Sequence, residues 1–401
     1  MSSSVHAWIP SDLRARGAEV RRFLESEILP VEAAIEAEDR AGRSTTLDGL
    51  RERAKEAGLW TPHLPVAWGG AGLGTLGMCV LFREMGRSPV GPTVFGCDAP
   101  DQGNMDLLLR VGSPSQRERW LRPLADGRIT SAFCMTEPAP GAGSDPRNLA
   151  TTAREDGDGW RLDGHKWYST GAGKASFLLV MARTSEDPRH GATIFLVPRH
   201  REGVVHVRDF DTMAEPLLAH REAELRFEGV RLDQSDILGG LGEGFSLAQL
   251  RLVPARLTHC MRWLGLASRT LSLCEDYVRR RISFGRPLAD HQLVQAMIAE
   301  AATTIHAGNL MTLACAAQLE NGDVHAARTA SSITKTFVAR GLCKILDDAV
   351  QMHGGLGFSG DMPFGRWYRY ARAARIADGP DEVHIGTIAR DVLAGRFDPM
   401  A

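Results

Sequence analysis

The chain has 401 residues, enough for two or three packed domains of roughly 100 to 200 residues each. Its 47 basic and 49 acidic residues give a formal net charge of -2, so no strong field attracts nucleic acid or an anionic membrane. No apolar run reaches the roughly 18 residues of a membrane-spanning helix, and residues 1–8 contain no apolar stretch typical of a secretory signal. The seven cysteines are scattered without a C-x-x-C pair, which favours buried thiols in a reducing compartment. We therefore expect a cytoplasmic protein that binds neither nucleic acid nor membrane.

The hydrophobic pattern predicts three regions in the order helices, strands, helices. From about Ser11 to Gly127 apolar residues recur with helical spacing. In the next region, short apolar runs separated by turns predict a small antiparallel β unit, with strands at 177–182, 192–197, 204–207 and 223–227. After a glycine-rich hinge at 239–244, helices are predicted at 245–281, 288–319, 325–353 and 381–394, enough for a four-helix bundle. The expected fold class is α+β, with domains at 1–128, 129–238 and 239–401.

The segment Gly72–Gly77 satisfies the pattern G-x-G-x-x-G of dinucleotide-binding proteins. That motif requires a preceding strand and a βαβ unit, because the glycines must bring the start of a helix against a pyrophosphate. Here a loop rich in proline and glycine precedes the motif, and helices surround it. We therefore predict a loop that leads into a helix rather than a nicotinamide site.

A second glycine-rich segment, 133–145, lies where the helical region gives way to strands. It reads Phe-Cys-Met-Thr-Glu-Pro-Ala-Pro-Gly-Ala-Gly-Ser-Asp. Glycines allow backbone N–H groups to approach an anion closely, and hydroxyl groups add hydrogen-bond donors, which suits the edge of a flavin. A surface turn is the alternative interpretation.

Three later segments carry further candidate chemistry, and each also has an ordinary structural explanation. Residues 164–173 contain Gly-His-Lys-Trp-Tyr-Ser-Thr and could be an exposed hairpin. Residues 281–292 begin with an arginine that could belong to a solvated charge run. Residues 377–384 place Asp378 on a Gly-Pro turn, where it could cap a helix or act as a catalytic base.

Together with Gln351–Phe358, these segments resemble the acyl-CoA dehydrogenase family in order and spacing, over roughly Phe23 to Leu393. Segments 254–262 and 377–384 are most similar to the dehydrogenase half of proteins in which a kinase is fused to the dehydrogenase. The resemblance implies an N-terminal helical domain, a middle β domain and a C-terminal helical bundle. No kinase portion occurs in this chain, so we expect any upstream kinase to be a separate protein.

The resemblance also implies FAD as cofactor and assigns residues to it. Tyr168 takes the place of an aromatic residue, usually Trp, that lies against the flavin ring, and Thr170 the place of a hydroxyl group near flavin N5. In the glycine-rich segment, Ala139 and Pro140 form an insertion relative to the family pattern, and the expected flavin contacts are Met135, Thr136 and Ser144. A second set is expected to hold the diphosphate and adenosine of FAD bound mainly by a neighbouring subunit of a homotetramer or homodimer: Arg281, Phe284, Gln292, Gln351, Gly354 and Gly355.

The family places its catalytic base at one of two positions. The earlier position corresponds here to 253–256, which contains no acid, whereas the later one, aligned through Arg369, gives Asp378. We expect Asp378 to be the base, with its backbone N–H and a flavin hydroxyl polarising the thioester, and Arg256 and Gly379 to contact the substrate. Asp is one methylene shorter than the usual Glu, which withdraws the carboxylate by about 1.5 Å. A structural ion pair remains the alternative for Arg256, and a metal site the alternative for the acids near Asp378 and for His384.

The expected reaction is FAD-dependent α,β-dehydrogenation of an acyl-CoA in fatty acid β-oxidation, with electrons passed to an electron-transferring flavoprotein. The resemblance to the fused proteins suggests a long, 2-methyl-branched or 4-hydroxyacyl chain, the last processed after phosphorylation. Two alternatives stay open. One is a flavin oxidase of the same fold, such as nitroalkane oxidase, which also uses Asp as its base; the other is a CoA-ester-binding protein that has lost turnover.

Overall fold

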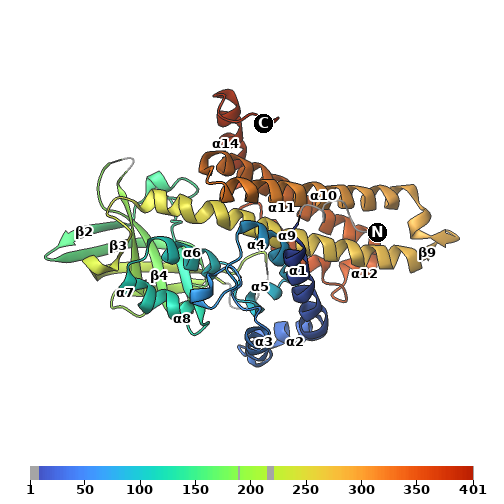
Figure 1. Ribbon diagram of the computed structural model, residues 1–401, viewed down its shortest axis with the longest axis horizontal. Helices are drawn as coiled ribbons and strands as arrows, with labels where there is room; N and C mark the ends of the chain where they lie inside the picture. The colour runs from blue at the N-terminus through green and yellow to red at the C-terminus, as the bar shows by residue number, and fades with distance from the viewer. Residues whose placement is uncertain (1–8, 188–189, 215–220, 401) are drawn as a thin grey trace.

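The computed structural model describes residues 9–187, 190–214 and 221–400, so the N-terminal segment 1–8 used above lies outside the described residues. The predicted order of helices, strands and helices is confirmed (Figure 1). The element type changes between Ala125 and Ser131 and again between Leu238 and Gly244. Among the described helices, none combines the length and apolarity needed to cross a membrane.

Helices form the N-terminal domain, and their apolar faces pack together because leucine, valine and phenylalanine recur with helical spacing. The glycine motif at 72–77 follows a short 3₁₀ helix at Val66–Trp68 and leads into α4, so the predicted loop before a helix is confirmed. The helices are α1 (Ser11–Phe23), α2 (Glu32–Arg40), α3 (Thr45–Glu56), α4 (Thr75–Met85), α5 (Gly91–Val94), α6 (Asp101–Val111), α7 (Pro114–Gln116) and α8 (Arg122–Ala125).

The middle domain is an eight-stranded sheet in the order β6-β7-β3-β2-β4-β5-β8, with β1 also paired to β4. The four predicted strands are present and most strand pairings are antiparallel, as predicted, but two parallel pairings make the sheet mixed. β1 runs parallel to β4, because the hairpin of β2 and β3 lies between these two strands along the chain. β2 also meets β4 in parallel, at one residue pair. The strands are β1 (Ser131–Cys134), β2 (Thr152–Asp156), β3 (Gly159–Thr170), β4 (Phe177–Arg183), β5 (Ala192–Pro198), β6 (Val204–Asp209), β7 (Glu222–Asp233) and β8 (Ile237–Leu238).

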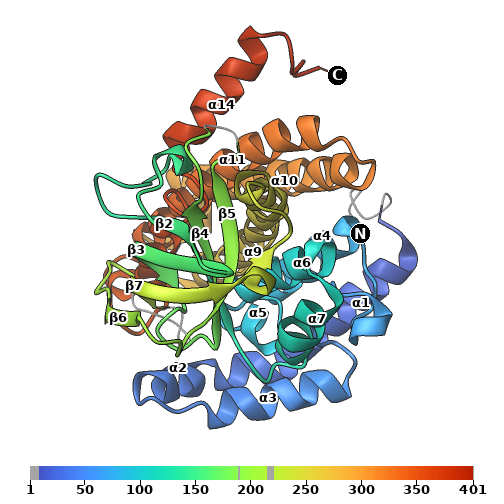
Figure 2. The same ribbon diagram turned by 90° about the vertical axis from the view of Figure 1, so that its left-hand side faces the viewer.

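Three long helices dominate the C-terminal domain, and α14 projects from its body (Figure 2). The predicted helices are all present, and the sequence pattern missed α13, which packs against α11. A small hairpin of β9 and β10 separates α9 from α10. The elements are α9 (Gly244–Arg280), β9 (Ile282–Ser283), β10 (Arg286–Pro287), α10 (Gln292–Glu320), α11 (Val324–His353), α12 (Gly355–Phe358), α13 (Phe364–Ala373) and α14 (Asp381–Leu393).

The hydrophobic clusters join the domains through α9. Its residues Leu257 and Met261 pack into the core of the N-terminal helices, whereas Leu247 and Ala248 pack against the sheet. Farther along, Trp263 and Leu264 belong to the core of the bundle. The seven cysteines are all buried free thiols, as the sequence predicts.

Candidate active site

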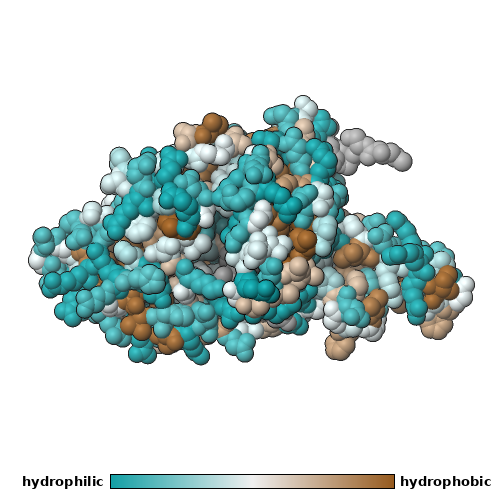
Figure 3. Space-filling model, turned by 90° about the horizontal axis from the view of Figure 1, so that it is seen from below, coloured by the Kyte–Doolittle hydropathy of each residue, from teal (hydrophilic) through white to brown (hydrophobic). Residues whose placement is uncertain are grey.

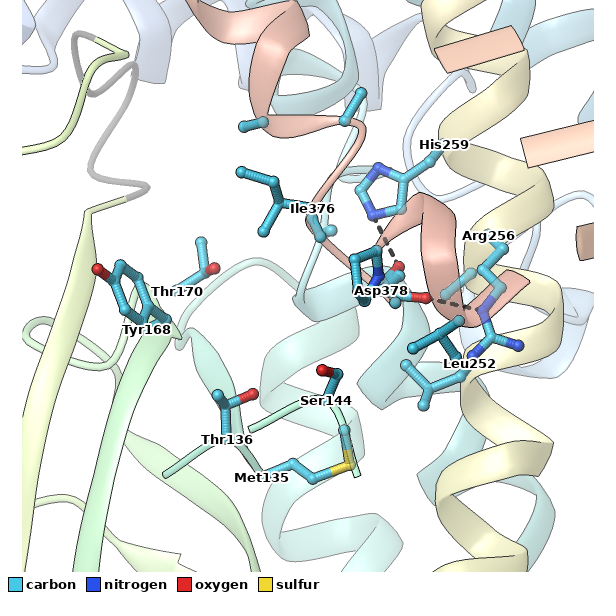
Figure 4. Close-up of a pocket in the computed structure, with 18 of the residues that line it drawn as sticks. Met135, Thr136, Ser144, Tyr168, Thr170, Leu252, Arg256, His259, Ile376 and Asp378 are labelled. Atoms are coloured by element: carbon cyan, nitrogen blue, oxygen red, sulfur yellow. Dashed lines mark hydrogen bonds and ion pairs between the residues drawn. The ribbon is translucent and has the colours of Figure 1, made fainter. Parts of the chain in front are cut away.

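A cavity of about 900 Å³ lies where the three domains meet (Figure 4). Its walls come from the loop before α6 and the first turn of α6, from β1, β3 and the loop after β1, and from α9, α11, α13 and α14. Eight residues predicted from the sequence line it: Met135, Thr136, Ser144, Tyr168, Thr170, Arg256, Asp378 and Gly379. Segments far apart in the chain are thus brought to one cavity.

Asp378 and Gly379 lie in a strained turn before α14. Both residues have positive φ values, +53° and +102°, a region that Asp tolerates better than most residues and that glycine adopts freely. Arg256 Nε donates to the carbonyl oxygen of Asp378 at 2.9 Å, and Lys335 Nζ donates to that of Gly379 at 2.6 Å. Two cations from α9 and α11 therefore fix the backbone that carries the acid.

The Asp378 carboxylate is held in its ionised form. Its Oδ2 lies 3.2 Å from His259 Nε2 on α9. Burial alone would raise the pKa of Asp378, but the imidazole of His259 and the guanidinium groups of Arg251 and Arg256 outweigh it, so the pKa is lowered. The side chain is 22% exposed and lines the cavity, where an ionised carboxylate can accept a proton.

No role was expected for His259 or Lys335 from the sequence. His259 follows Arg256 by three residues, so the helical period alone places both on one face of α9. Lys335 is 44 residues from its partner Gly379, and no local pattern reveals that contact.

Asp381 and His384, which lie close to Asp378 in the sequence, both contact other side chains of the protein. Asp381 Oδ2 accepts from Arg340 at 2.9 Å and from Arg375 at 2.8 Å. His384 Nδ1 lies 3.1 Å from Ser332 Oγ. In the described part of the chain, no group of three or more His, Cys, Asp or Glu side chains could hold a metal ion.

The β-domain wall of the cavity is shaped by an irregularity in β3. The pairing of β3 with β7 shifts between Lys166 and Ser169, and Tyr168 within the shift has φ +49°. The Tyr168 ring stacks on Phe210 with centroids 4.4 Å apart and remains 49% exposed. Tyr168 and Thr170 therefore both line the cavity, across from Asp378 (Figure 4).

A buried ion pair fixes the loop after β1. Lys166 Nζ lies 2.7 Å from Glu137 Oε1 and also donates to the carbonyl of Met135, while Glu137 accepts from three backbone N–H groups of the same loop. Burial would raise the pKa of Glu137, but Lys166 and these hydrogen bonds lower it to about 2. The inserted Ala139 and Pro140 lie within a turn closed by the bond from the Gly141 N–H to the Pro138 carbonyl, and Ser144 still lines the cavity.

The remaining predicted residues lie outside this cavity, at the end of the bundle marked by β9 and α12 (Figure 1). Apolar side chains gather on this end (Figure 3): Phe284 is 95% exposed, Phe358 89% and Leu293 79%. Tyr277 and His353 stack with centroids 4.1 Å apart, which holds the ends of α9 and α11 together. The set at this end comprises Arg281, Phe284, Gln292, Gln351, Gly354 and Gly355.

Each of the three domains matches a model of a known protein family. Residues 11–128 match the model of the acyl-CoA dehydrogenase N-terminal domain, 132–230 the middle domain and 242–393 the C-terminal domain. The chain belongs to the acyl-CoA dehydrogenase family. This oxidoreductase family consists of flavoproteins, and the resemblance inferred from the motifs is confirmed.

Individual relatives agree with the family assignment. FadE2 of Mycobacterium tuberculosis, named as an acyl-CoA dehydrogenase, is 40% identical over 357 residues, covering 87% of this chain and 86% of that protein. Human acyl-CoA dehydrogenase family member 11 is 36% identical over 92% of this chain, which spans only 49% of that protein's length. A solved structure from Mycobacterium abscessus, also named as an acyl-CoA dehydrogenase, superposes with a TM-score of 0.91 at 37% identity, covering 97% of this chain and all of the other.

The residues lining the cavity fit a flavin ring. The hydroxyl groups of Thr136, Ser144 and Thr170 supply hydrogen-bonding groups for the polar edge of the heterocycle. The half-exposed ring of Tyr168 offers an aromatic surface for stacking. The wall that carries these groups faces the wall that carries Asp378 (Figure 4).

We predict that Gly379→Ala destabilises the protein. A Cβ at this position would lie 3.0 Å from His384 Nε2, and φ is +102°, so the turn must distort at a cost of about 1 to 3 kcal/mol. Gly365→Ala on α13 is the matched control, because a Cβ there meets nothing within 4 Å and alanine favours the helix. Equilibrium unfolding in urea should show a loss for Gly379→Ala only; equal stability of the two variants would contradict a strained turn.

Proposed function

We propose that the protein catalyses FAD-dependent α,β-dehydrogenation of an acyl-CoA thioester to the 2-enoyl-CoA. The observation that carries this proposal is an ionised Asp378 facing, across one cavity, the hydroxyl and aromatic groups of the β domain. Asp378 is the base that removes the α proton. When bound, FAD would be held by Thr136, Ser144, Tyr168 and Thr170 and would supply the hydride acceptor for the β carbon.

The chain's own groups prepare the substrate for proton removal. The backbone N–H of Asp378 donates to the thioester carbonyl and thereby stabilises negative charge that develops on its oxygen. Entry of the acyl chain expels water from the cavity, and the loss of solvation raises the pKa of Asp378 toward that of a stronger base. Arg256 and Gly379 line the same cavity and contact the substrate there.

For the acyl chain, we propose a long, 2-methyl-branched or 4-hydroxyacyl group, the last bound in its 4-phospho form. A cavity of about 900 Å³ has room for a long or branched chain. Its lining includes Arg251, Arg256 and Arg328, and guanidinium groups favour an anionic substituent. In the last case, a separate kinase would supply the phosphorylated substrate.

For the assembly, we propose a homotetramer or homodimer in which the bundle end of one subunit completes the FAD site of another. The exposed apolar side chains around Phe284 support a subunit contact, since patches of this kind are unusual on a free surface. Electrons then pass to an electron-transferring flavoprotein in fatty acid β-oxidation. Seven buried free thiols support a reducing compartment such as the cytoplasm.

We expect anaerobic titration with acyl-CoA esters to bleach the bound flavin. The panel contains straight long-chain, 2-methyl-branched, 4-hydroxy and 4-phospho forms, and the subset that bleaches names the substrate class. A flavin unmoved by every thioester would contradict the proposed reaction. Rapid reoxidation in air with peroxide release would indicate an oxidase instead, and nitroalkanes are then the test substrates.

We predict that Asp378→Asn retains FAD but loses flavin reduction. The amide has the shape of the carboxylate but cannot take up the α proton, so the rate should fall by about two to four orders of magnitude. Stopped-flow spectroscopy with the best thioester measures it, and Asp158→Asn in the exposed β2–β3 turn should match the wild type. Undiminished reduction by Asp378→Asn would mean that another group is the base.

We predict that Arg281→Ala lowers FAD retention and weakens the assembly. Its guanidinium group is exposed at the end of α9, where it can pair with the diphosphate of a neighbouring subunit's FAD. Arg279→Ala is the matched control, because that exposed arginine pairs with Glu275 on its own helix. The FAD-to-protein ratio after gel filtration and the mass by light scattering are measured together; unaltered values for Arg281→Ala would contradict the role.

A further inference from the structure

His259 lines the cavity and lies next to Asp378, the acid of the proposed reaction. Its Nε2 lies 3.2 Å from Asp378 Oδ2, and this oxygen is buried without a hydrogen bond of standard geometry although the side chain as a whole is 22% exposed. The ring stacks on Trp263, one turn farther along α9, with centroids 5.3 Å apart and planes at 23°. Both the position and the plane of the imidazole are therefore fixed by packing.

The partner of its second nitrogen determines which nitrogen carries the proton. Arg262 Nη2 lies 3.2 Å from His259 Nδ1, and a guanidinium group can only donate, so Nδ1 accepts. The single proton of the neutral ring is then on Nε2, which faces Asp378 Oδ2 across the 3.2 Å contact. Arg262 is itself anchored, because its Nη1 donates to the Cys97 carbonyl at 2.9 Å and to Asp98 Oδ1 at 3.1 Å.

The geometry points to His259 as a positioning residue that holds Oδ2 of Asp378 and leaves Oδ1 to take the α proton. This inference rests on the proposed function of Asp378. In the step itself, the α C–H bond breaks and its proton forms a bond to Oδ1; the electron pair of that bond forms the α–β double bond, and the β hydride would pass to the bound flavin. His259 keeps its proton throughout; its side chain lines the cavity, and its role is to hold Asp378.

Positive groups already surround Asp378, so the neutral imidazole of His259 adds orientation of the carboxylate rather than further positive charge. Positive groups on two helices face the carboxylate or His259: Arg251, Arg256 and Arg262 on α9 and Lys335 on α11. The other titratable neighbours are His384 on α14 and Asp98 before α6. Burial raises the pKa values of Tyr370 and Cys260, so both stay neutral at neutral pH. Burial and Arg262 lower the pKa of His259, which keeps the ring neutral.

An aspartate has particular need of such a partner. Its carboxylate reaches about 1.5 Å less far than that of glutamate, so a rotated or displaced carboxylate is less able to reach the α carbon. A misplacement of about 1 Å at a reacting centre costs on the order of a hundredfold in rate. A fixed donor on Oδ2 prevents that rotation without occupying Oδ1.

Two substitutions separate this role from packing. His259→Phe keeps the flat ring against Trp263 but has no donor, whereas His259→Gln has an amide N–H near the position of Nε2 but no aromatic ring. We expect the thioester to reduce the bound flavin of His259→Phe about ten- to a hundredfold more slowly than that of the wild type. Because the lost hydrogen bond favoured the ionised carboxylate, the acid limb of the pH–rate profile should move up by about one to two units. His259→Gln should restore the limb and most of the rate.

Because entry of the acyl chain raises the pKa of Asp378, anaerobic stopped-flow reduction is measured with saturating thioester between pH 4 and pH 9 for the FAD-loaded wild type, both variants and Asp378→Asn, with thermal unfolding recorded for each. A normal rate and pH limb in His259→Phe would overturn the positioning role, as would a loss in His259→Gln equal to that in His259→Phe. If instead the wild type is not reduced, or Asp378→Asn is reduced normally, the proposed function fails and the inference falls with it. An acid limb that moves in His259→Phe and returns to its wild-type position in His259→Gln supports both the proposed function and the positioning role of His259.

Discussion

The turn that carries Asp378 and Gly379 depends on two buried cations that hold its carbonyl groups. Arg256 and Lys335 come from different helices and bond consecutive carbonyls, those of Asp378 and Gly379. A hydrogen bond to a charged group contributes about 1.5 to 3 kcal/mol, which is enough to offset backbone strain of similar size. Each cation would in turn be costly to bury without its acceptor. The position of the acid is thus set by how α9 and α11 pack together.

One helix connects this turn to the rest of the molecule. α9 has 37 residues and is about 55 Å long, and it packs against the N-terminal helices, the sheet and the bundle. The same helix carries Arg256 and His259 at the cavity and ends next to Arg281 at the far end of the bundle. Any shift of α9 would move the acid and the proposed subunit contact together.

The sequence pattern predicted the elements whose signal is local. Long helices such as α9 and α11 and the apolar strands β4 and β5 have strong periods, whereas β3 alternates charged and aromatic residues and α13 is short and rich in arginine and tyrosine. The lining residues were found because family motifs placed them, not because of periodicity. Contacts such as Arg256 with Asp378, 122 residues apart, depend on tertiary packing and leave no local trace. His259 was within reach of sequence reasoning through its helical spacing from Arg256.

Both walls of the cavity are stabilised in the same way, by a buried cation that hydrogen-bonds to backbone carbonyl groups. On the β side, Lys166 binds both Glu137 and the Met135 carbonyl, so the loop after β1 and strand β3 move as one unit. Because Glu137 also collects the N–H groups of Ala150 and Thr151, the turn that contains Ala139 and Pro140 can lengthen without moving the residues on either side. Each wall is therefore rigid in itself, and the distance across the cavity is set by domain packing. A shorter acid such as Asp378 can then be accommodated only by a change in that packing or by a substrate that approaches more closely.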